Sequence, residues 1–117
     1  MQEPKFSIIV PAYNAQDHIQ KCLESIAFQQ YRDFELIVVC DSCTDETENL
    51  VKMYRYGAKT DNVQFGRDGL TRDRGLEMAA GDWILFCDDD DWFVHEYVLQ
   101  ILADTIKRQK EVVDIKL

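Results

Sequence analysis

The sequence has only five glycines, and their spacing forms neither of the two common glycine-rich loops that bind phosphate groups. The patterns G-x-G-x-x-G and G-x-x-x-x-G-K-[ST] are both absent, which disfavours dinucleotide-dependent dehydrogenases and P-loop nucleotidases. No apolar run approaches the roughly 20 residues of a membrane-spanning helix, and the amino terminus lacks the basic and apolar regions of a signal peptide. We therefore expect a cytoplasmic location and no membrane segment in this chain.

Basic residues are scarce, with 13 Lys and Arg against 22 Asp and Glu, so the formal net charge is -9. This charge argues against nucleic acid or an anionic membrane surface as the main partner. An anionic ligand would need a cation or a local basic group in order to bind.

The chain has four cysteines, too few to predict a disulfide framework, so a reducing compartment is the simpler inference. Cys40 and Cys43 form a C-x-x-C pattern. No second such pattern or nearby histidine pair completes a tetrahedral zinc site, so we expect these side chains to fill the core and a loop.

Short apolar runs alternate with amphipathic segments, and a hydrophobic content of 46% is enough for the core of one domain. The expected strands cover residues 6–10, 35–40, 63–65 and 83–87. The expected helices cover residues 17–28, a segment around 50–54, residues 71–80 and residues 94–106. This alternation predicts an α/β fold, an open parallel sheet with helices on both faces. Residues 112–115 resemble the start of another strand, so the chain looks like the truncated first part of a larger domain.

Polar side chains follow three of the expected strands. They lie at residues 11–14, 41–45 and 88–91. Ligands of open α/β sheets bind beyond the carboxyl ends of the strands, so these segments predict a shared binding site.

Four consecutive aspartates, residues 88–91, directly follow the expected buried strand 83–87. Side chains alternate faces on an extended strand, so Asp88 and Asp90 are expected to point the same way. Close carboxylates repel one another by a few kcal/mol at an effective dielectric constant near 20, and a divalent cation would relieve that repulsion. Magnesium, manganese and calcium suit such oxygen ligands. The alternative is a solvated acidic turn that also caps the following helix.

These groups fit a nucleotide. Tyr13 could pack on a flat base, Asp41 could accept from a base N–H or a ribose hydroxyl, and the aspartates could hold a metal on a diphosphate. Arg72 or Arg74 would help to neutralise the diphosphate.

The opening S-I-I-V-P-A-Y-N together with I-L-F-C-D-D-D-D-W resembles glycosyltransferase family 2, the inverting nucleotide-sugar transferases with the A-type fold. The resemblance covers nearly the whole chain. It implies a Rossmann-like fold, a nucleoside-diphosphate sugar donor that is commonly UDP-linked, and Mn²⁺ or Mg²⁺. It assigns nucleotide binding to Pro11, Tyr13, Asp41, Arg72, Asp88 and Asp89, and metal contact to Asp90 and Asp88.

The resemblance also has gaps. Cys40 replaces the first acid of the family's D-D-G-S-T-D turn, Ser42 and Cys43 replace its Gly-Ser, and Asp73 stands where Asn is usual. Inverting transfer needs a general base, which in the family lies in the second half of the fold and is therefore expected beyond Leu117. We thus expect residues 1–117 to be the nucleotide-sugar-binding part, with the acceptor-binding half missing.

The longer protein would transfer a sugar to a hydroxyl acceptor on a glycan, a lipid-linked molecule or a protein, in polysaccharide biosynthesis, in the cytoplasm or at the inner face of the membrane. Two other functions remain open. One is a non-catalytic nucleotide-binding or interaction module of the same fold. The other is a phosphoacceptor receiver domain, which would need an acidic pair after its first strand, where this chain has residues 11–14 instead.

Overall fold

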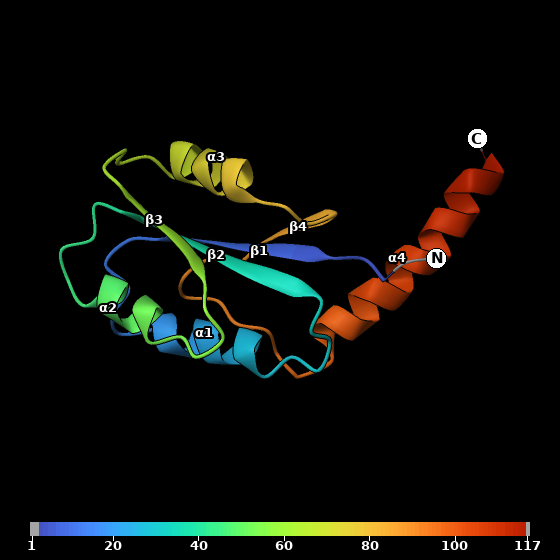
Figure 1. Cartoon of the computed structure of the whole chain (residues 1–117), viewed down its shortest axis with the longest axis horizontal. Helices are drawn as coiled ribbons and strands as arrows, with labels where there is room; N and C mark the ends of the chain where they lie inside the picture. The colour runs from blue at the N-terminus through green and yellow to red at the C-terminus, as the bar shows by residue number, and fades with distance from the viewer. Residues whose placement is uncertain (1–2, 117) are drawn as a thin grey trace.

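Four strands and four helices alternate along residues 3–116, which are the residues that the computed structural model describes. In chain order they are β1 (Phe6–Ala12), α1 (Ile19–Ala27), β2 (Phe34–Asp41), α2 (Thr47–Lys52), β3 (Lys59–Val63), α3 (Asp68–Met78), β4 (Trp83–Phe86) and α4 (Val98–Lys116). The strands form one parallel sheet in the order β3-β2-β1-β4. Helices α1 and α2 lie on one face of the sheet and α3 on the other (Figure 1). The predicted α/β architecture is therefore confirmed.

The two central strands are buried on both faces, because each strand sends alternate side chains to opposite sides. Ile8, Val10 and Val38 belong to the larger core cluster, which also contains buried residues of α1. Ile9 and Ile37 belong to a smaller cluster on the opposite face, where α3 packs. These two apolar layers hold the carboxyl ends of β1 and β2 in fixed positions.

Strand β1 continues through Pro11, where the sequence predicted its end. The carbonyl of Ile9 accepts a hydrogen bond from the amide of Cys87, so Ile9 faces β4. Pro11, two residues later, faces the same side, where β4 has already ended at Phe86. Its missing N–H therefore removes no bond from the sheet.

The third strand is Lys59–Val63, and the predicted position at residues 63–65 is wrong. This strand stands at the edge of the sheet and is polar, with Lys59 paired to Glu35 and Asp61 paired to Arg74. A search for apolar alternation does not find such an edge strand, because its side chains face water and charged neighbours rather than a core.

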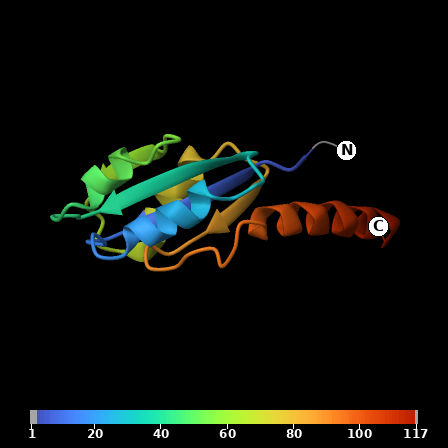
Figure 2. The ribbon, with the colours of Figure 1, turned by 90° about the horizontal axis from the view of Figure 1, so that it is seen from below.

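Residues 112–115 continue helix α4, so the predicted strand at this position is also wrong. The residues before them, Arg108 to Glu111, all favour helix, and no glycine or proline interrupts the segment. Leu99 and Ala103 in the first half of α4 are fully buried, whereas its far end leads away from the sheet (Figures 1 and 2).

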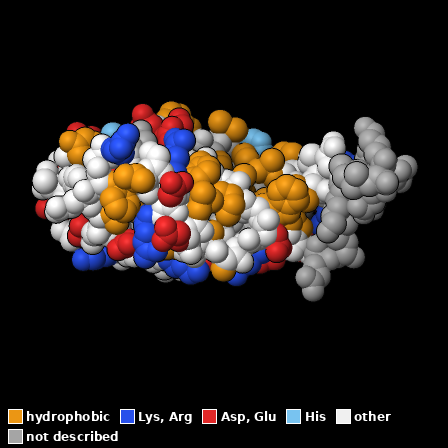
Figure 3. Space-filling view, turned by 90° about the horizontal axis from the view of Figure 1, so that it is seen from above, with side chains coloured by type: hydrophobic (Ala, Val, Ile, Leu, Met, Phe, Trp, Pro, Cys, Tyr) orange, Lys and Arg blue, Asp and Glu red, His pale blue; other side chains and the backbone are white. Residues whose placement is uncertain are grey.

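Hydrophobic side chains are exposed on the side of the molecule that carries α3 (Figure 3). The exposed residues of β4 are Trp83, Ile84 and Phe86, and β4 is the last strand in the sheet order. No helix among the described residues combines the length and the apolar character needed to cross a membrane.

Candidate nucleotide and metal site

The carboxyl ends of β1, β2 and β4 meet around a pocket of about 550 Å³. It is lined by Pro11, Ala12, Tyr13, Asp41, Ser42, Gly66, Arg67, Thr71, Arg72, Asp88, Asp89 and Asp90. All seven residues to which the family resemblance assigned nucleotide or metal binding are in this set. The structure thus brings together side chains from four segments that are far apart in the sequence.

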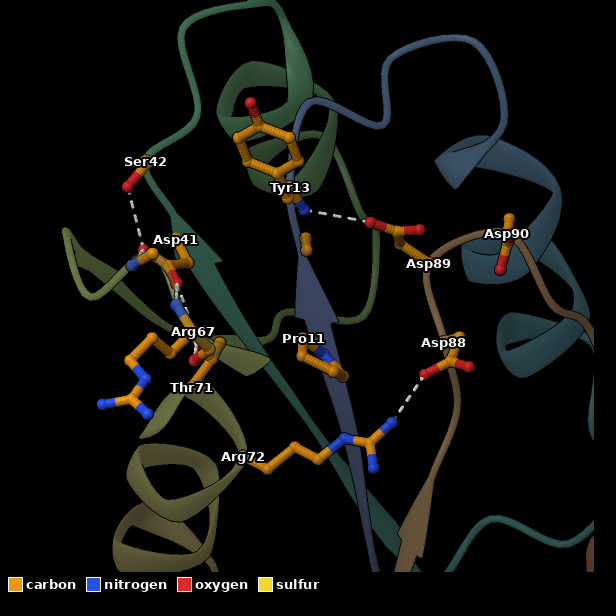
Figure 4. A pocket seen from close by; sticks show the side chains of 12 residues that line it. Pro11, Tyr13, Asp41, Ser42, Arg67, Thr71, Arg72, Asp88, Asp89 and Asp90 are labelled. Atoms are coloured by element: carbon orange, nitrogen blue, oxygen red, sulfur yellow. Dashed lines mark hydrogen bonds and ion pairs between the residues drawn. The ribbon is translucent and has the colours of Figure 1, made fainter. Parts of the chain in front are cut away.

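The pocket has two walls of different chemistry (Figure 4). Asp41 lies on one side with Thr71 from α3, the aspartates after β4 lie on the other side, and Pro11 and Tyr13 lie between them. The Tyr13 side chain is 62% exposed, so its ring is free to contact a ligand. A planar group could stack on this ring while a charged group reaches the aspartates.

The carboxylate of Asp41 accepts hydrogen bonds from five donors, although the residue is only 6% exposed. The donors are the amides of Phe65, Gly66 and Arg67 and the hydroxyls of Ser42 and Thr71, at 2.8 to 3.2 Å. Burial opposes ionisation of Asp41, but the hydrogen bonds from Gly66, Thr71, Ser42 and Phe65 outweigh it and hold the pKa below its usual range. Asp41 therefore fixes the loop that leads into α3.

Ser42 has a positive φ of 59°, a conformation that favours glycine. Glycine is the residue that the family resemblance leads one to expect at this position. Ser42 adopts the same kind of backbone at some cost in strain, and its hydroxyl donates to Asp41 at 3.0 Å. The serine at this position thus adopts a backbone conformation that glycine would adopt without strain.

Asp88, Asp90 and Asp91 form an exposed group in which one carboxylate oxygen from each residue lies within 4.8 Å of the others. The expectation that Asp88 and Asp90 share one side therefore agrees with the structure. Asp91 was not predicted as a member, because alternation along a strand would turn it away, but the chain turns after Phe86.

Asp89 is directed away from that group. One of its oxygens accepts a hydrogen bond from the amide of Tyr13 at 3.0 Å, and the other lies 3.4 Å from Nε2 of His18. His18 could not be identified from the sequence, because a single histidine near a helix start is more often a surface or capping residue.

Arg72 reaches across the pocket from α3 and donates to Asp88 at 3.1 Å (Figure 4). Its guanidinium lies over the ring of Phe86, 5.4 Å from the centroid. Its Nε is buried and has no hydrogen-bond partner among the described residues. An anion in the pocket could pair with the positive charge of Arg72, since this side chain lines the pocket and is 43% exposed.

Arg74, the other arginine considered for a diphosphate, does not line the pocket. Its guanidinium is paired instead with Asp61 at 2.7 Å and Glu77 at 3.1 Å. Residues that the sequence reasoning missed are Arg67, Thr71 and Gly66, which line the pocket because Asp41 holds their segment in place.

Cys40 lies in the core and Cys43 lies in the loop that follows β2. Cys40 is 2% exposed in the core, and burial raises the pKa of its thiol to about 12. Cys43 contacts the carbonyl of Ala12 at 3.5 Å. Neither belongs to a group of metal-binding side chains among residues 3–116.

The chain is similar in sequence to a known protein family and to individual proteins. The family model described as Glycosyl transferase family 2 matches residues 7–116. Glycosyltransferase GlyA of Streptococcus pneumoniae is 30% identical over 94% of this chain. Poly(ribitol-phosphate) beta-N-acetylglucosaminyltransferase TarS of Staphylococcus aureus is 34% identical over 97% of it. The chain spans only 16% of GlyA and 21% of TarS.

Solved protein structures are also similar to this chain. The crystal structure of S. aureus TarS 1-349 in complex with UDP-GlcNAc has a TM-score of 0.81 and 34% identity, covering 89% of this chain and 31% of that one. Glucosyl-3-phosphoglycerate synthase from Mycobacterium tuberculosis, in complex with Mn²⁺, UDP and glucosyl-3-phosphoglycerate, has a TM-score of 0.62 and 25% identity. That likeness covers 74% of this chain and 33% of the synthase.

Proposed function

This chain belongs to glycosyl transferase family 2, and on that premise we propose that it is the donor-binding part of an enzyme that transfers a sugar from a nucleoside-diphosphate sugar to a hydroxyl acceptor. The observation that carries the proposal is the single pocket in which Tyr13, Asp41, Arg72 and the aspartates after β4 meet. Family membership rules out the receiver-domain alternative. A receiver domain would also need an acidic pair after β1, which this chain lacks.

The donor would lie along the pocket, with its base near Pro11, Tyr13 and Asp41. We propose a uridine base, because TarS, at 34% identity, was crystallised with UDP-GlcNAc. Five donors from the chain already fill the acceptor positions of the Asp41 carboxylate, so a contact with the base would replace one of these bonds. Arg72 and Asp88 would contact the diphosphate and ribose end of the donor.

The residues after β4 fit a divalent cation, because three carboxylates converge there and hard cations prefer oxygen ligands. We propose Asp90 and Asp88 as the residues that would hold Mn²⁺ or Mg²⁺. A cation bound there would neutralise the charge that develops on the departing diphosphate. Arg72 lies beside Asp88 and would add positive charge on the same side of the pocket.

Inversion requires the acceptor oxygen to attack the anomeric carbon from the face opposite the leaving diphosphate, while a general base takes its proton. We assign no aspartate of residues 88–91 to that role, because Asp88, Asp90 and Asp91 cluster where the cation would bind and Asp89 accepts from the Tyr13 amide. The base and the acceptor site would lie beyond residue 117. The exposed Trp83 and Phe86 on β4 support this division, since a further part of the domain would bury them.

The acceptor would be a hydroxyl on a glycan, a lipid-linked molecule or a protein. We favour a polymeric acceptor, since the name of TarS gives poly(ribitol-phosphate) as its substrate. The donor is water-soluble, so transfer would take place in the cytoplasm or, in a longer protein, at the inner face of the membrane.

Calorimetric titration of UDP with and without Mn²⁺ tests this function. We expect heat of binding that increases with Mn²⁺, and we expect Asp90→Ala to weaken binding in Mn²⁺ by about tenfold or more because a cation ligand is lost. Asp90 is exposed, so the variant should stay folded. Asp33→Ala is the matched control, because it removes an exposed carboxylate outside the pocket.

Two outcomes would contradict the proposal. If Asp90→Ala bound UDP with Mn²⁺ as tightly as the parent chain, the metal assignment would be wrong. If the parent released no heat in either condition, the chain would be a non-catalytic module that keeps the fold.

A further inference from the structure

Asp89 differs from the other aspartates after β4 in what its carboxylate contacts. The group that could hold a cation consists of Asp88, Asp90 and Asp91. Asp89 instead accepts from the Tyr13 amide at 3.0 Å and lies beside His18. Its side chain is 18% exposed, against 52% for Asp88. The carboxylate is thus partly buried between the segment after β4 and the loop after β1.

The loop after β1 is held on its other side by the segment that leads into α2. The amide of Ala15 donates to the Thr47 hydroxyl at 2.7 Å, and the amide of Gln16 donates to Asp45 at 3.2 Å. Asn14, which has a positive φ of 39°, accepts from the Thr44 amide at 2.8 Å. All these bonds run to residues 44–47, at the start of α2, so none of them connects the loop with β4.

The bond between Asp89 and Tyr13 therefore has a distinct position in the site. It joins the backbone of Tyr13, whose ring lies in the pocket, to residues 88–91, which include the three clustered aspartates. Because of this bond, Tyr13 cannot shift far without moving Asp89, and Asp89 cannot shift far without moving Tyr13. His18, at the start of α1, stands at the second oxygen and limits rotation of the carboxylate.

We propose that Asp89 is a positioning residue, which places the Tyr13 ring for the nucleoside by bonding to the Tyr13 amide, with His18 holding the carboxylate in that orientation. This inference rests on the proposed donor site. Asp89 acts through Tyr13 and contributes neither a cation ligand nor a direct contact with the sugar or diphosphate. The same bond fixes the distance between the base end and the diphosphate end of the pocket.

Amide hydrogen exchange of the ligand-free protein tests the bond without any assumption about the ligand. In Asp89→Ala the Tyr13 amide loses its acceptor, so we expect its exchange to accelerate by about tenfold or more. The amide of Ala15, which donates to Thr47, is the internal control and should keep its protection. His18→Ala leaves the acceptor in place but frees it to rotate, and should accelerate Tyr13 exchange by about two- to threefold.

Titration with uridine in EDTA tests the consequence for binding, because uridine has no phosphate and EDTA removes divalent cations. We expect Asp89→Ala to weaken uridine binding by about 3- to 10-fold, the effect of losing one hydrogen bond. Asp89→Asn should restore affinity to within about twofold, because a carboxamide oxygen can accept from the same amide. Asp33→Ala, which removes an exposed carboxylate outside the pocket, should leave uridine binding unchanged.

The outcomes separate this inference from the proposed function. Unchanged Tyr13 exchange in Asp89→Ala would overturn the inference, as would faster exchange with unaltered uridine affinity. Equal loss of affinity in Asp89→Asn and Asp89→Ala would also overturn it, since the charge would then act directly. If the parent chain did not bind uridine, the proposed donor would be wrong. The exchange rate of the Tyr13 amide would then still show whether Asp89 accepts its hydrogen bond.

Discussion

Glu35, at the start of β2, connects three other parts of the sheet layer through its carboxylate. It accepts from the Ser7 hydroxyl and the Ala80 amide, both at 2.6 Å, and pairs with Lys59 at 2.7 Å. Burial opposes its ionisation, but the bonds from Lys59, Ser7 and Ala80 outweigh this effect and lower its pKa to about 2. The ionised carboxylate thus stabilises the folded state.

This pKa predicts how stability depends on pH. The folded-state pKa is below the ordinary value of 4.5, so the contribution of Glu35 is fully present above pH 4.5 and is lost as the pH falls toward 2. We expect Glu35→Gln to lower the free energy of unfolding by about 2 kcal/mol at pH 7 and to flatten its decline below pH 4.5. Urea denaturation at several pH values measures this. Glu24→Gln, at an exposed position of α1, is the control, and equal pH profiles for Glu35→Gln and the parent would contradict the prediction.

The site residues show which roles can be inferred from sequence alone. Asp41 was identified because it ends a buried strand, and Asp90 because it lies among four acids after another. The five donors around Asp41 were not foreseeable, since the amides come from residues 65–67, more than 20 positions away, and a loop leaves no periodic pattern. The bond from Tyr13 to Asp89 was missed for the same reason.

At the scale of single elements, α3 lies close to the sheet because it has a glycine at the contact. A Cβ atom on Gly75 would approach Cγ2 of Ile9 to 2.4 Å, and Ile9 is fully buried. Gly69, in the first turn of the same helix, has no atom within 4 Å of such a position. The two glycines thus allow a matched comparison within one helix.

We expect Gly75→Ala to lower the free energy of unfolding by about 1–2 kcal/mol, because overpacking against Ile9 outweighs the helix propensity gained. Gly69→Ala should raise it by about 0.5 kcal/mol, because alanine favours helix and meets no neighbour. Urea denaturation of both variants measures the difference. Equal stability of the two would show that α3 does not pack against Ile9 as described.

Elements with an apolar face were predicted well, and the errors fall where that face is absent. The continuous apolar runs in β1 and β2 identified the central strands, because side chains on both faces of those strands enter the core. Strand β3 was misplaced because it is a polar edge strand. Residues 112–115 were assigned to a strand because β-branched residues occur in strands and helices alike.

At the scale of the whole molecule, the parallel sheet determines where a ligand can bind. Parallel strands end at one edge, so polar residues that follow different strands gather there regardless of their separation in sequence. The order β3-β2-β1-β4 places β1 between β2 and β4, and Pro11 and Tyr13 accordingly lie between Asp41 and the aspartates. A net charge of -9 also means that an anionic donor would depend on Arg72 and a cation at this edge.

A crystal structure of the chain with UDP and Mn²⁺ would show whether the donor binds in this pocket. We expect an ion bound by Asp90 and Asp88, a diphosphate between that ion and Arg72, and a uracil ring on Tyr13. An ordered UDP bound elsewhere, with the carboxylates of Asp88 and Asp90 facing only water, would contradict this expectation.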